Sequence, residues 1–574
     1  MFLWMIRAIL FVSQADYAKS FLVYTRGDKM KCKKHLVFML LIIILATMTA
    51  CGQQEVADIE NNEIQELAEN HKPADGGNLK VSVTRFNTLN PLLNSNYSLF
   101  QLHHLIYQGL VTFDSSMNIQ PVLAEKWEIA EDGQSIQFHL KQGVTWHDGQ
   151  AFTAEDVIFT INAIKGNLKN AKGNSVFKTS LQQISDVRET ETGVINITFS
   201  RPFSNGLNSM VFPILPKHLF EGSNIERFSA TDFPLIGTGP YKLQTYDTMR
   251  EIKLIRNDNY WGKKPYIEGI NAVIVPDVEA QLSIFENGDI DLAQPTSIDW
   301  AKYIEKNNVN VYEYVSHNYE FLGFNFKNTI LRDRNIRRAI AYGIDRHRLI
   351  NNIYLGHGTV VDVPIYPLSE IYSKDGLKYG YNIEKATEFL NKTDYIMDEN
   401  EIVRVGGDGS SLAFNLISNS DNILREKTAY FIQEELQKIG IEVNIELLEW
   451  EEFNIRVNQG KYDMLLGGWE LSYLPDLSFA FHSSQIGGSN FIFYNDEAMD
   501  GLIEETFTAP NEEIKKRTYD RLQKQIIEEL PYFSLFFKNG SIAVRDKIKG
   551  NFKPNNYNLF NGIEEWYINL DENI

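Results

Sequence analysis

Residues 123–157 read LAEKWEIAEDGQSIQFHLKQGVTWHDGQAFTAEDV, and this stretch holds the local signals that decide the fold. Within it, Ser135–Leu140 is predicted to form an antiparallel strand. Thr153 is the expected N-cap of a helix, and Asp156 occupies the capping-box position. The helix pattern continues through apolar residues at helical spacing, namely Val157, Ile158, Ile161 and Ile164. The stretch therefore predicts β-strands followed by a capped helix.

Similar signals recur towards the carboxyl terminus. Asp333 and Asp345 are the expected caps of two successive helices, and residues 422–439 predict a longer helix that ends at Gly440. Residues 441–447 alternate as a half-buried strand, and residues 462–466 form an apolar run typical of a buried strand. The fold class is therefore α/β, with mixed sheets in at least two lobes.

The composition excludes several functional classes. The chain has 574 residues, of which 55 are Lys or Arg and 75 are Asp or Glu, so its net charge is −20. A surface this acidic repels phosphate backbones, and the sequence contains no basic patch that could bind a nucleic acid. Cys32 and Cys51 are the only cysteines. A disulfide-linked core, a Cys-based zinc site and an iron–sulfur cluster are therefore excluded after residue 51.

Residues 1–50 are predicted to be a signal region. A basic cluster at 31–34 precedes an apolar run at 36–46, and small residues precede Cys51, which is the order found in a secretory signal. We take Met30 as the true start and Cys51 as a lipid-attachment residue, because its surroundings resemble a bacterial lipobox. An uncleaved membrane anchor is the alternative. The acidic, polar residues 51–77 are predicted to be a tether.

Motifs of catalysis are missing from the sequence. It contains no zincin motif, nucleophile elbow, Walker loop or dinucleotide fingerprint. His103 and His104 are neighbours, and adjacent residues do not share a face of a helix or strand. We therefore expect no enzyme activity, no catalytic residue, no cofactor and no metal site.

Separated blocks of the chain resemble the family 5 extracellular solute-binding proteins, the peptide- and nickel-binding lipoproteins of ABC importers. The blocks are residues 123–157, Gly237–Lys242, Arg256–Gly262, Phe324–Asn325, Ile336–Arg346 and Gly468-Trp469. The resemblance implies a two-lobed, periplasmic-binding-protein-like clamp with an extra subdomain in the first lobe. One lobe would comprise residues 78–322 and 535–574, and the other residues 323–534. Crossings near Phe324 and Phe536 would form the hinge.

The resemblance also implies a function and partners. A ligand bound by both lobes favours the closed state, so the clamp would shut on an oligopeptide or a similar small solute. The receptor would be a monomer, lipid-anchored at the outer face of the membrane of a bacterium with a single membrane. It would deliver its ligand to an ABC permease and the ATPase subunits of that permease.

The resemblance places the site after the Gly468-Trp469 pair. In peptide-binding relatives an Asp that binds the ligand ammonium lies there, but in this chain Ser472 occupies its position and Leu474 replaces a second common Asp. Asp476 is the remaining candidate, with a turn or N-cap residue as the alternative. Glu470 is a less favoured substitute.

Other candidate ligand-binding residues follow from the same resemblance. Trp469 is expected against the ligand or in the core. Tyr473 and Tyr97 are further aromatic candidates, and Asn325 is expected to face the cleft. The arginines at the start of the helix after Asp333 are expected to form surface salt bridges instead; they are Arg334, Arg337 and Arg338.

Two alternative functions remain open from the sequence. The cleft could hold another solute, namely a nickel chelate, haem or an oligosaccharide. A chelate calls for His or Arg at the cleft, whereas a sugar calls for exposed aromatic residues. The protein could also be a peptide-signal receptor that takes no part in transport.

Overall fold

A computed structural model describes the fold of this chain. The residues that it describes are 73–166, 175–221, 233–295, 300–304, 306, 308–373, 375, 378–397 and 402–569. Residues 73–569 belong to one compact unit. The predicted signal region, the lipid-attachment residue Cys51 and most of the predicted tether lie outside the described residues. No helix of the described part is long and apolar enough to cross a bilayer.

A mixed sheet lies in the first lobe, next to the amino-terminal end of the described residues. Its strands, in order across the sheet, are β1 (Asn78–Thr84), β10 (Gly269–Val275), β9 (Glu251–Arg256) and β8 (Tyr241–Asp247). β1 pairs with β10 in parallel, whereas the other pairs are antiparallel. The apolar side chains of β1 that point to one face, including Leu79 and Val81, are buried in the core. The first lobe also contains β2 (Val111–Phe113), β3 (Ile119–Pro121), β18 (Ile548–Lys549), β19 (Tyr567–Ile568), η1 (Asn208–Val211), η4 (Ile563–Glu565), α4 (Tyr97–His103), α7 (Val278–Asn287) and α8 (Trp300–Ile304).

A separate antiparallel sheet forms the extra subdomain of the first lobe. Its order is β4 (Ala124–Ile129), β5 (Ser135–Leu140), β7 (Val194–Phe199) and β6 (Ile184–Glu191), accompanied by α5 (Ala154–Lys165) and α6 (Lys217–Phe220). The predicted capping box is confirmed, because the Thr153 backbone N–H donates to Asp156 at 2.8 Å and the reciprocal bond is also present. The predicted strand over 135–140 is confirmed as β5.

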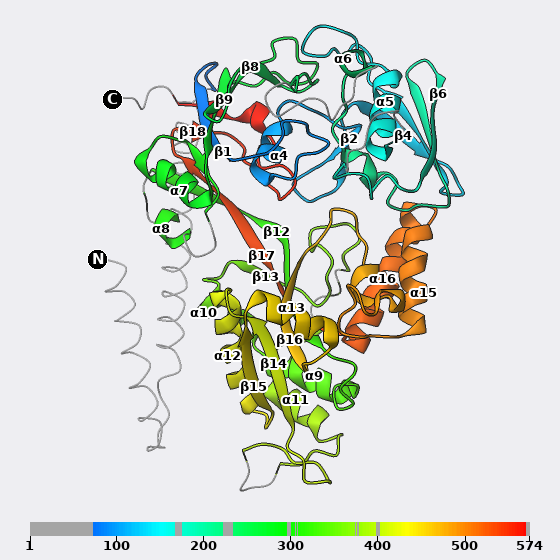
Figure 1. Ribbon diagram of the computed structural model, residues 1–574, viewed down its shortest axis with the longest axis vertical. Helices are drawn as coiled ribbons and strands as arrows, with labels where there is room; N and C mark the ends of the chain where they lie inside the picture. The colour runs from blue at the N-terminus through cyan, green and yellow to red at the C-terminus, as the bar shows by residue number, and fades with distance from the viewer. Residues whose placement is uncertain are drawn as a thin grey trace, which may run out of the picture. The chain divides into compact units, whose positions relative to one another are not determined.

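Two long paired strands connect the lobes. They belong to a sheet with the order β11 (Leu292–Ala293), β17 (Tyr532–Arg545), β12 (Val309–Phe324), β16 (Met464–Glu470), β14 (Ala413–Asn419) and β15 (Glu442–Leu448), and β13 (Gly358–Val360) also pairs with β17. Figure 1 shows β12 and β17 running side by side from one lobe to the other.

Part-way along these two strands, the side chains stop packing in one hydrophobic cluster and begin packing in another. Tyr314 packs on the first-lobe cluster, whereas Tyr319 belongs to a second-lobe cluster; on β17 the change falls between Phe537 and Ile542. The β12–β17 ladder also shifts register between Val315 and Tyr319. We therefore propose that the lobes meet at these positions, with residues 315–539 as the second lobe, and that the hinge lies here instead of near Phe324 and Phe536.

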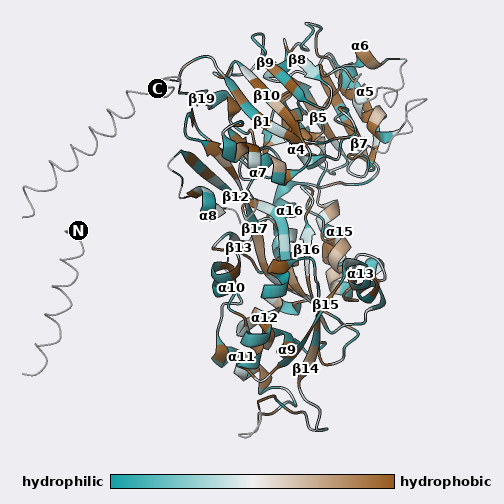
Figure 2. Cartoon of the chain, turned by 60° about the vertical axis from the view of Figure 1, so that its left-hand side comes forward, coloured by the Kyte–Doolittle hydropathy of each residue, from teal (hydrophilic) through white to brown (hydrophobic). Residues whose placement is uncertain are grey.

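The second lobe contains the remaining helices. They are α9 (Arg334–Gly343), α10 (Arg346–Ile353), α11 (Ile383–Leu390), α12 (Ile423–Gln437), α13 (Trp450–Gln459), α14 (Ser478–Phe481), η3 (Ser483–Gln485), α15 (Glu497–Thr508) and α16 (Glu512–Glu529). The predicted caps Asp333 and Asp345 are confirmed, because each side chain accepts a backbone hydrogen bond in the first helical turn. Figure 2 shows the hydrophobic colour concentrated on sheet strands such as β10, whereas α10 is largely hydrophilic.

The prediction that Arg337 lies at the surface is wrong. Its side chain is 1% exposed. The carbonyl groups at the end of α16 have no partners within that helix, and Arg337 supplies donors to Glu529 and Leu530, each at 3.2 Å from Nε. The neighbouring arginines do form the expected ion pairs, Arg334 with Glu529 and Arg338 with Glu528, both at 2.7 Å.

Candidate functional site

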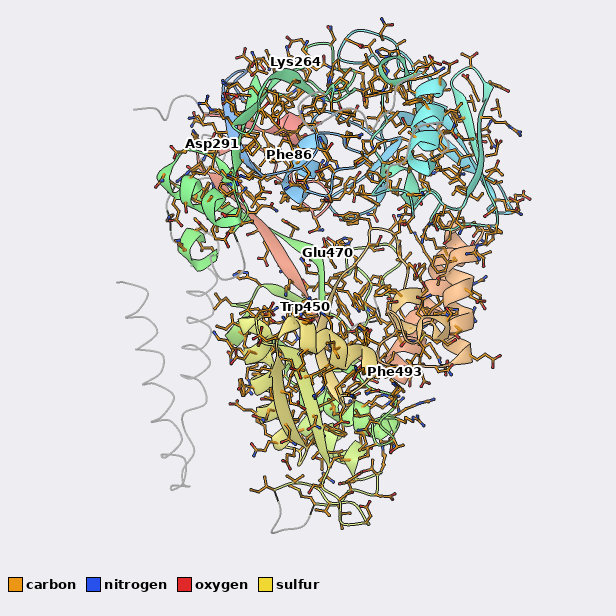
Figure 3. All side chains as sticks on the ribbon, in the orientation of Figure 1. Phe86, Lys264, Asp291, Trp450, Glu470 and Phe493 are labelled. Carbon is orange, nitrogen blue, oxygen red and sulfur yellow. The ribbon has the colours of Figure 1, made fainter. Side chains whose placement is uncertain are left out.

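Strand β16 leads to the loop that carries most of the candidate site residues, at the boundary between the lobes. It pairs antiparallel with β12, and Trp469 lies opposite Tyr319. The strand ends at Glu470, and residues 471–477 form a loop before α14; we call this the cleft loop. Figure 3 shows Glu470 at the level between the two lobes. The first residue of the cleft loop is still bonded to β12, because the Leu471 backbone N–H donates to the carbonyl of His317 at 2.9 Å.

A cavity of about 70 Å³ lies beside the cleft loop, and its walls come from both lobes. The first lobe contributes Met117 and Asn208, whereas the second contributes all seven cleft-loop residues. The remaining walls are His317, Pro364, Ile365, Tyr366, Ser369 and Ile371. A site built from both lobes gives a ligand contacts that exist only when the lobes are together, so binding favours that arrangement.

Tyr473 joins the cleft loop to the first lobe. Its hydroxyl donates to the carbonyl of Asn556 at 3.0 Å and accepts from the Asn556 amide at 3.2 Å. Its ring meets the ring of Tyr557 edge-on, with the centroids 5.2 Å apart. Tyr97 donates to the same Asn556 carbonyl at 3.0 Å. Burial raises the pKa of both tyrosines well above the usual range, so both hydroxyls remain protonated donors.

Asp476 and Ser472 both line the cavity. Oδ1 of Asp476 accepts hydrogen bonds from the backbone N–H and the hydroxyl of Ser478, at 2.7 and 2.6 Å. This is the geometry of a turn residue at the start of α14, which is the structural alternative to ligand binding that the sequence left open for Asp476. Asp476 nevertheless also lines the cavity. Ser472 is exposed, and its Oγ accepts from the backbone N–H of Leu474 at 3.1 Å.

Trp469 and Asn325 lie away from the lining of this cavity. The Trp469 ring stacks on Phe491 at 5.4 Å and meets Phe479 edge-on at 4.9 Å, in the second-lobe core. Asn325 is 2% exposed, and its amide group bonds to the backbone carbonyls of Gly460 and Tyr462 at 3.0 and 2.6 Å. Both amide hydrogens are therefore used to hold the chain after β12, and we leave Asn325 out of the proposed site.

A buried charge cluster lies beneath the Gly468-Trp469 pair. Glu320 on β12 is 4% exposed, and its carboxylate binds Arg425 Nε at 2.8 Å and Lys538 Nζ at 2.6 Å. Burial raises the pKa of Glu320, but the two cations outweigh this effect and hold the pKa below its usual value. A Cβ on Gly468 would lie 2.9 Å from the Glu320 carboxylate, so glycine leaves the space that the cluster occupies.

Further contacts join the lobes around the loop that contains Ser204. Lys515 on α16 is 4% exposed and donates to the Ser204 carbonyl at 3.0 Å. The Asn205 amide donates to the carbonyl of Pro475 in the cleft loop at 2.9 Å. The cleft loop is thus held by first-lobe residues as well as by its own strand.

Sequence reasoning missed His317, Tyr366 and Asn556. Each is a single residue without a motif, and Asn556 lies 83 positions from its partner Tyr473. Among the described residues, no three His, Cys, Asp or Glu side chains are arranged to hold a metal ion.

The comparisons with known proteins agree with this architecture. The sequence profile of the bacterial extracellular solute-binding proteins, family 5 Middle, matches residues 118–490. The oligopeptide-binding protein AppA of Bacillus subtilis is 28% identical over 557 residues, which cover 94% of this chain and all of AppA. The haem-binding protein A of Haemophilus influenzae is 26% identical and covers 80% of this chain and 86% of its own length.

Solved structures share the fold. AppA of Bacillus subtilis in complex with a nonapeptide superposes with a TM-score of 0.60, covering 87% of this chain and all of that chain. NikZ of Campylobacter jejuni in complex with Ni(L-His) gives a TM-score of 0.64 at 26% identity, covering 85% of this chain and 99% of that chain.

Proposed function

Because this chain belongs to the bacterial extracellular solute-binding proteins of family 5, which are substrate receptors and not enzymes, we propose that it captures oligopeptides between its lobes and delivers them to an ABC permease. The observation that carries the proposal is the lining of the cavity beside the cleft loop, which comes from both lobes. At about 70 Å³ the cavity takes only a small part of a peptide, and the rest would lie between the lobes beyond it. Support comes from AppA, which this chain matches over its whole length and which has been solved with a nonapeptide.

The chemistry of the cleft suits a ligand of variable sequence. An extended peptide presents the same backbone donors and acceptors whatever its side chains are, and polar groups along a cleft can pair with them. Ser472, Tyr473 and Asp476 are the proposed contact residues, since all three line the cavity. Tyr97 supports the site from the first lobe through Asn556, and Trp469 supports the strand that leads to the cleft loop.

Closure follows from the same arrangement. The Tyr473–Asn556 contact and the Lys515–Ser204 contact join the lobes, and a bound peptide would add contacts to both lobes. The ligand therefore increases the population of the closed state, which is the form that the permease would recognise.

The position in the cell is also part of the proposal. Cys51 would carry the lipid that holds the receptor at the outer face of the membrane, and residues 51–77 would be its tether. The receptor would act as a monomer, because one chain supplies both walls of the cavity.

A metal chelate or haem is a second candidate ligand. The haem-binding relative and NikZ, which has been solved with Ni(L-His), favour this candidate. Their alignments each cover more than three quarters of this chain. The unpaired nitrogen of a buried cleft histidine, described below, is the group in this site that such a ligand would use.

Native mass spectrometry of the chain from residue 51 onward tests the proposal. The protein is purified under mild conditions, and the mass that co-purifies is measured before and after addition of a random nonapeptide mixture. Bound masses that match peptides support the proposal. A constant mass of haem or of a nickel complex, unchanged by the peptide mixture, would assign the second candidate instead.

A further inference from the structure

His317 lies on β12 within the region where the strand shifts register between Val315 and Tyr319. It lines the cavity beside the cleft loop, yet its side chain is only 3% exposed. Its ring lies between two cavity tyrosines, with centroids 4.7 Å from Tyr366 and 4.8 Å from Tyr473. The imidazole is therefore fixed in place at the wall of the cavity.

The hydrogen bonds of His317 determine where its proton lies. Nδ1 lies 3.1 Å from the carbonyl oxygen of Leu471. A carbonyl oxygen only accepts, so Nδ1 must carry the hydrogen. Burial lowers the pKa of His317 to about 4, so the ring carries no second proton at neutral pH. Nε2 is consequently a bare acceptor.

This acceptor has no hydrogen-bond partner within the described part of the chain, although it is fully buried. The two neighbouring hydroxyls are already used, because Tyr366 donates to the Val315 carbonyl at 3.1 Å and Tyr473 donates to Asn556. Buried polar atoms in native proteins almost always have a partner. An unpaired acceptor on a residue that lines a binding cavity is therefore a candidate partner for the ligand, which reaches the buried Nε2 when the walls of the cavity move apart.

We propose that His317 is a ligand-binding residue whose Nε2 accepts a hydrogen bond from the bound solute, and that for a peptide the donor is a backbone N–H. The inference rests on the proposed function and names one of its contacts. The same atom disfavours a carboxylate at this position, because two acceptors would face each other across a site that excludes water. His317 thus selects the orientation in which a peptide enters the cavity.

Two substitutions separate the ring nitrogens. His317→Asn keeps a donor near the Nδ1 position and removes the acceptor at Nε2, whereas His317→Gln places an amide group near Nε2. The probe is the random nonapeptide mixture, followed by one peptide isolated from it by native mass spectrometry. We expect His317→Asn to bind that peptide about 10-fold more weakly and His317→Gln to stay within about threefold of the unmodified protein. The melting temperature of each ligand-free variant monitors folding.

A spectroscopic measurement tests the assignment directly. In protein with ¹⁵N-labelled histidine, the Nε2 resonance of His317 should lie at the position of an unprotonated nitrogen and move upfield when the isolated peptide binds. An Nε2 resonance that does not move on binding would overturn the inference. A displacement and broadening caused by Ni(L-His), with none caused by peptide, would overturn it in favour of metal coordination.

The remaining outcomes are distinguishable. If the unmodified protein binds no peptide, the proposed function fails and the donor assigned to His317 fails with it. If the unmodified protein binds and both variants bind equally well, the inference alone is overturned. If both variants lose binding together with melting temperature, His317 has a structural role and the inference is also overturned.

Discussion

The hydroxyl oxygen of Tyr473 lies 3.0 Å from the carbonyl oxygen of Asn556, and this hydrogen bond joins the cleft loop of the second lobe to the carboxyl-terminal part of the first. Tyr97 donates to the same carbonyl oxygen. Tyr473, which we propose to contact the ligand, therefore also joins the two lobes.

Removing the Tyr473 hydroxyl should shift the clamp towards an open state. Tyr473→Phe keeps the ring against Tyr557 but loses an interlobe hydrogen bond worth about 1 kcal/mol, which changes the closed-to-open ratio by about fivefold. Small-angle scattering of the ligand-free protein should show a larger radius of gyration. Tyr430→Phe, at an exposed position on α12, is the matched control. Identical scattering for both variants would contradict a closing role for Tyr473.

The charge of Asp476 can be separated from its turn geometry. Asp476→Asn keeps an oxygen that can accept from Ser478, whereas Asp476→Ala removes it. If the carboxylate binds the ligand ammonium, both variants should weaken a free-amine nonapeptide more than its acetylated form, by about 1.5–3 kcal/mol in titration calorimetry. Only Asp476→Ala should also lower stability, by about 1 kcal/mol. Equal losses for the two peptides would remove Asp476 from the anchoring role.

The Glu320 cluster should be important for stability. Glu320→Gln leaves Arg425 and Lys538 without their shared carboxylate, and breaking a buried ion pair in this way costs about 3–5 kcal/mol. Urea denaturation measures the change. Glu446→Gln is the control, because its partner Arg456 lies at 2.8 Å but both side chains are more exposed, so the loss should stay below about 1 kcal/mol. Similar losses for the two variants would contradict a special contribution from burial.

Acid should destabilise the first lobe through His103. Burial lowers the pKa of this histidine from 6.5 to about 3. Between these values the unfolded state binds more protons than the folded state, so stability increases with pH and falls on acidification, by about 1.4 kcal/mol per pH unit. His103→Leu should reduce the slope of the urea midpoint against pH between 6.5 and about 4, whereas the surface variant His347→Gln should not. Part of the slope should persist, because burial also lowers the pKa values of His104, His147 and His317. An unchanged slope in His103→Leu would refute this assignment.

Cys51→Ser should release the protein from the membrane if Cys51 carries a lipid. Cell fractionation followed by immunoblotting measures the change, and Cys32→Ser within the signal region is the matched control. Retention of Cys51→Ser in the membrane fraction would favour the uncleaved anchor.

Much of the local structure could be predicted from the sequence. The Thr153 capping box, the caps Asp333 and Asp345 and the strand over 135–140 depend on side chains within a few residues of one another. Arg337 shows where such reasoning fails. In the sequence its position resembles that of Arg334 and Arg338. Its side chain is nevertheless buried, because it donates hydrogen bonds to carbonyls at the end of α16, 192 positions away.

The sequence by itself determined the α/β class, the family resemblance and the segment in which the cleft loop lies, because these depend on short patterns. Only the tertiary structure decided which side chains meet in the cleft. Tyr97, 459 positions from Asn556, reaches the same carbonyl as Tyr473, and burial among residues distant in the sequence, such as Tyr366 and Tyr473, lowers the pKa of His317. Desolvation and long-range hydrogen bonding arise only when distant segments pack, so no local pattern encodes them.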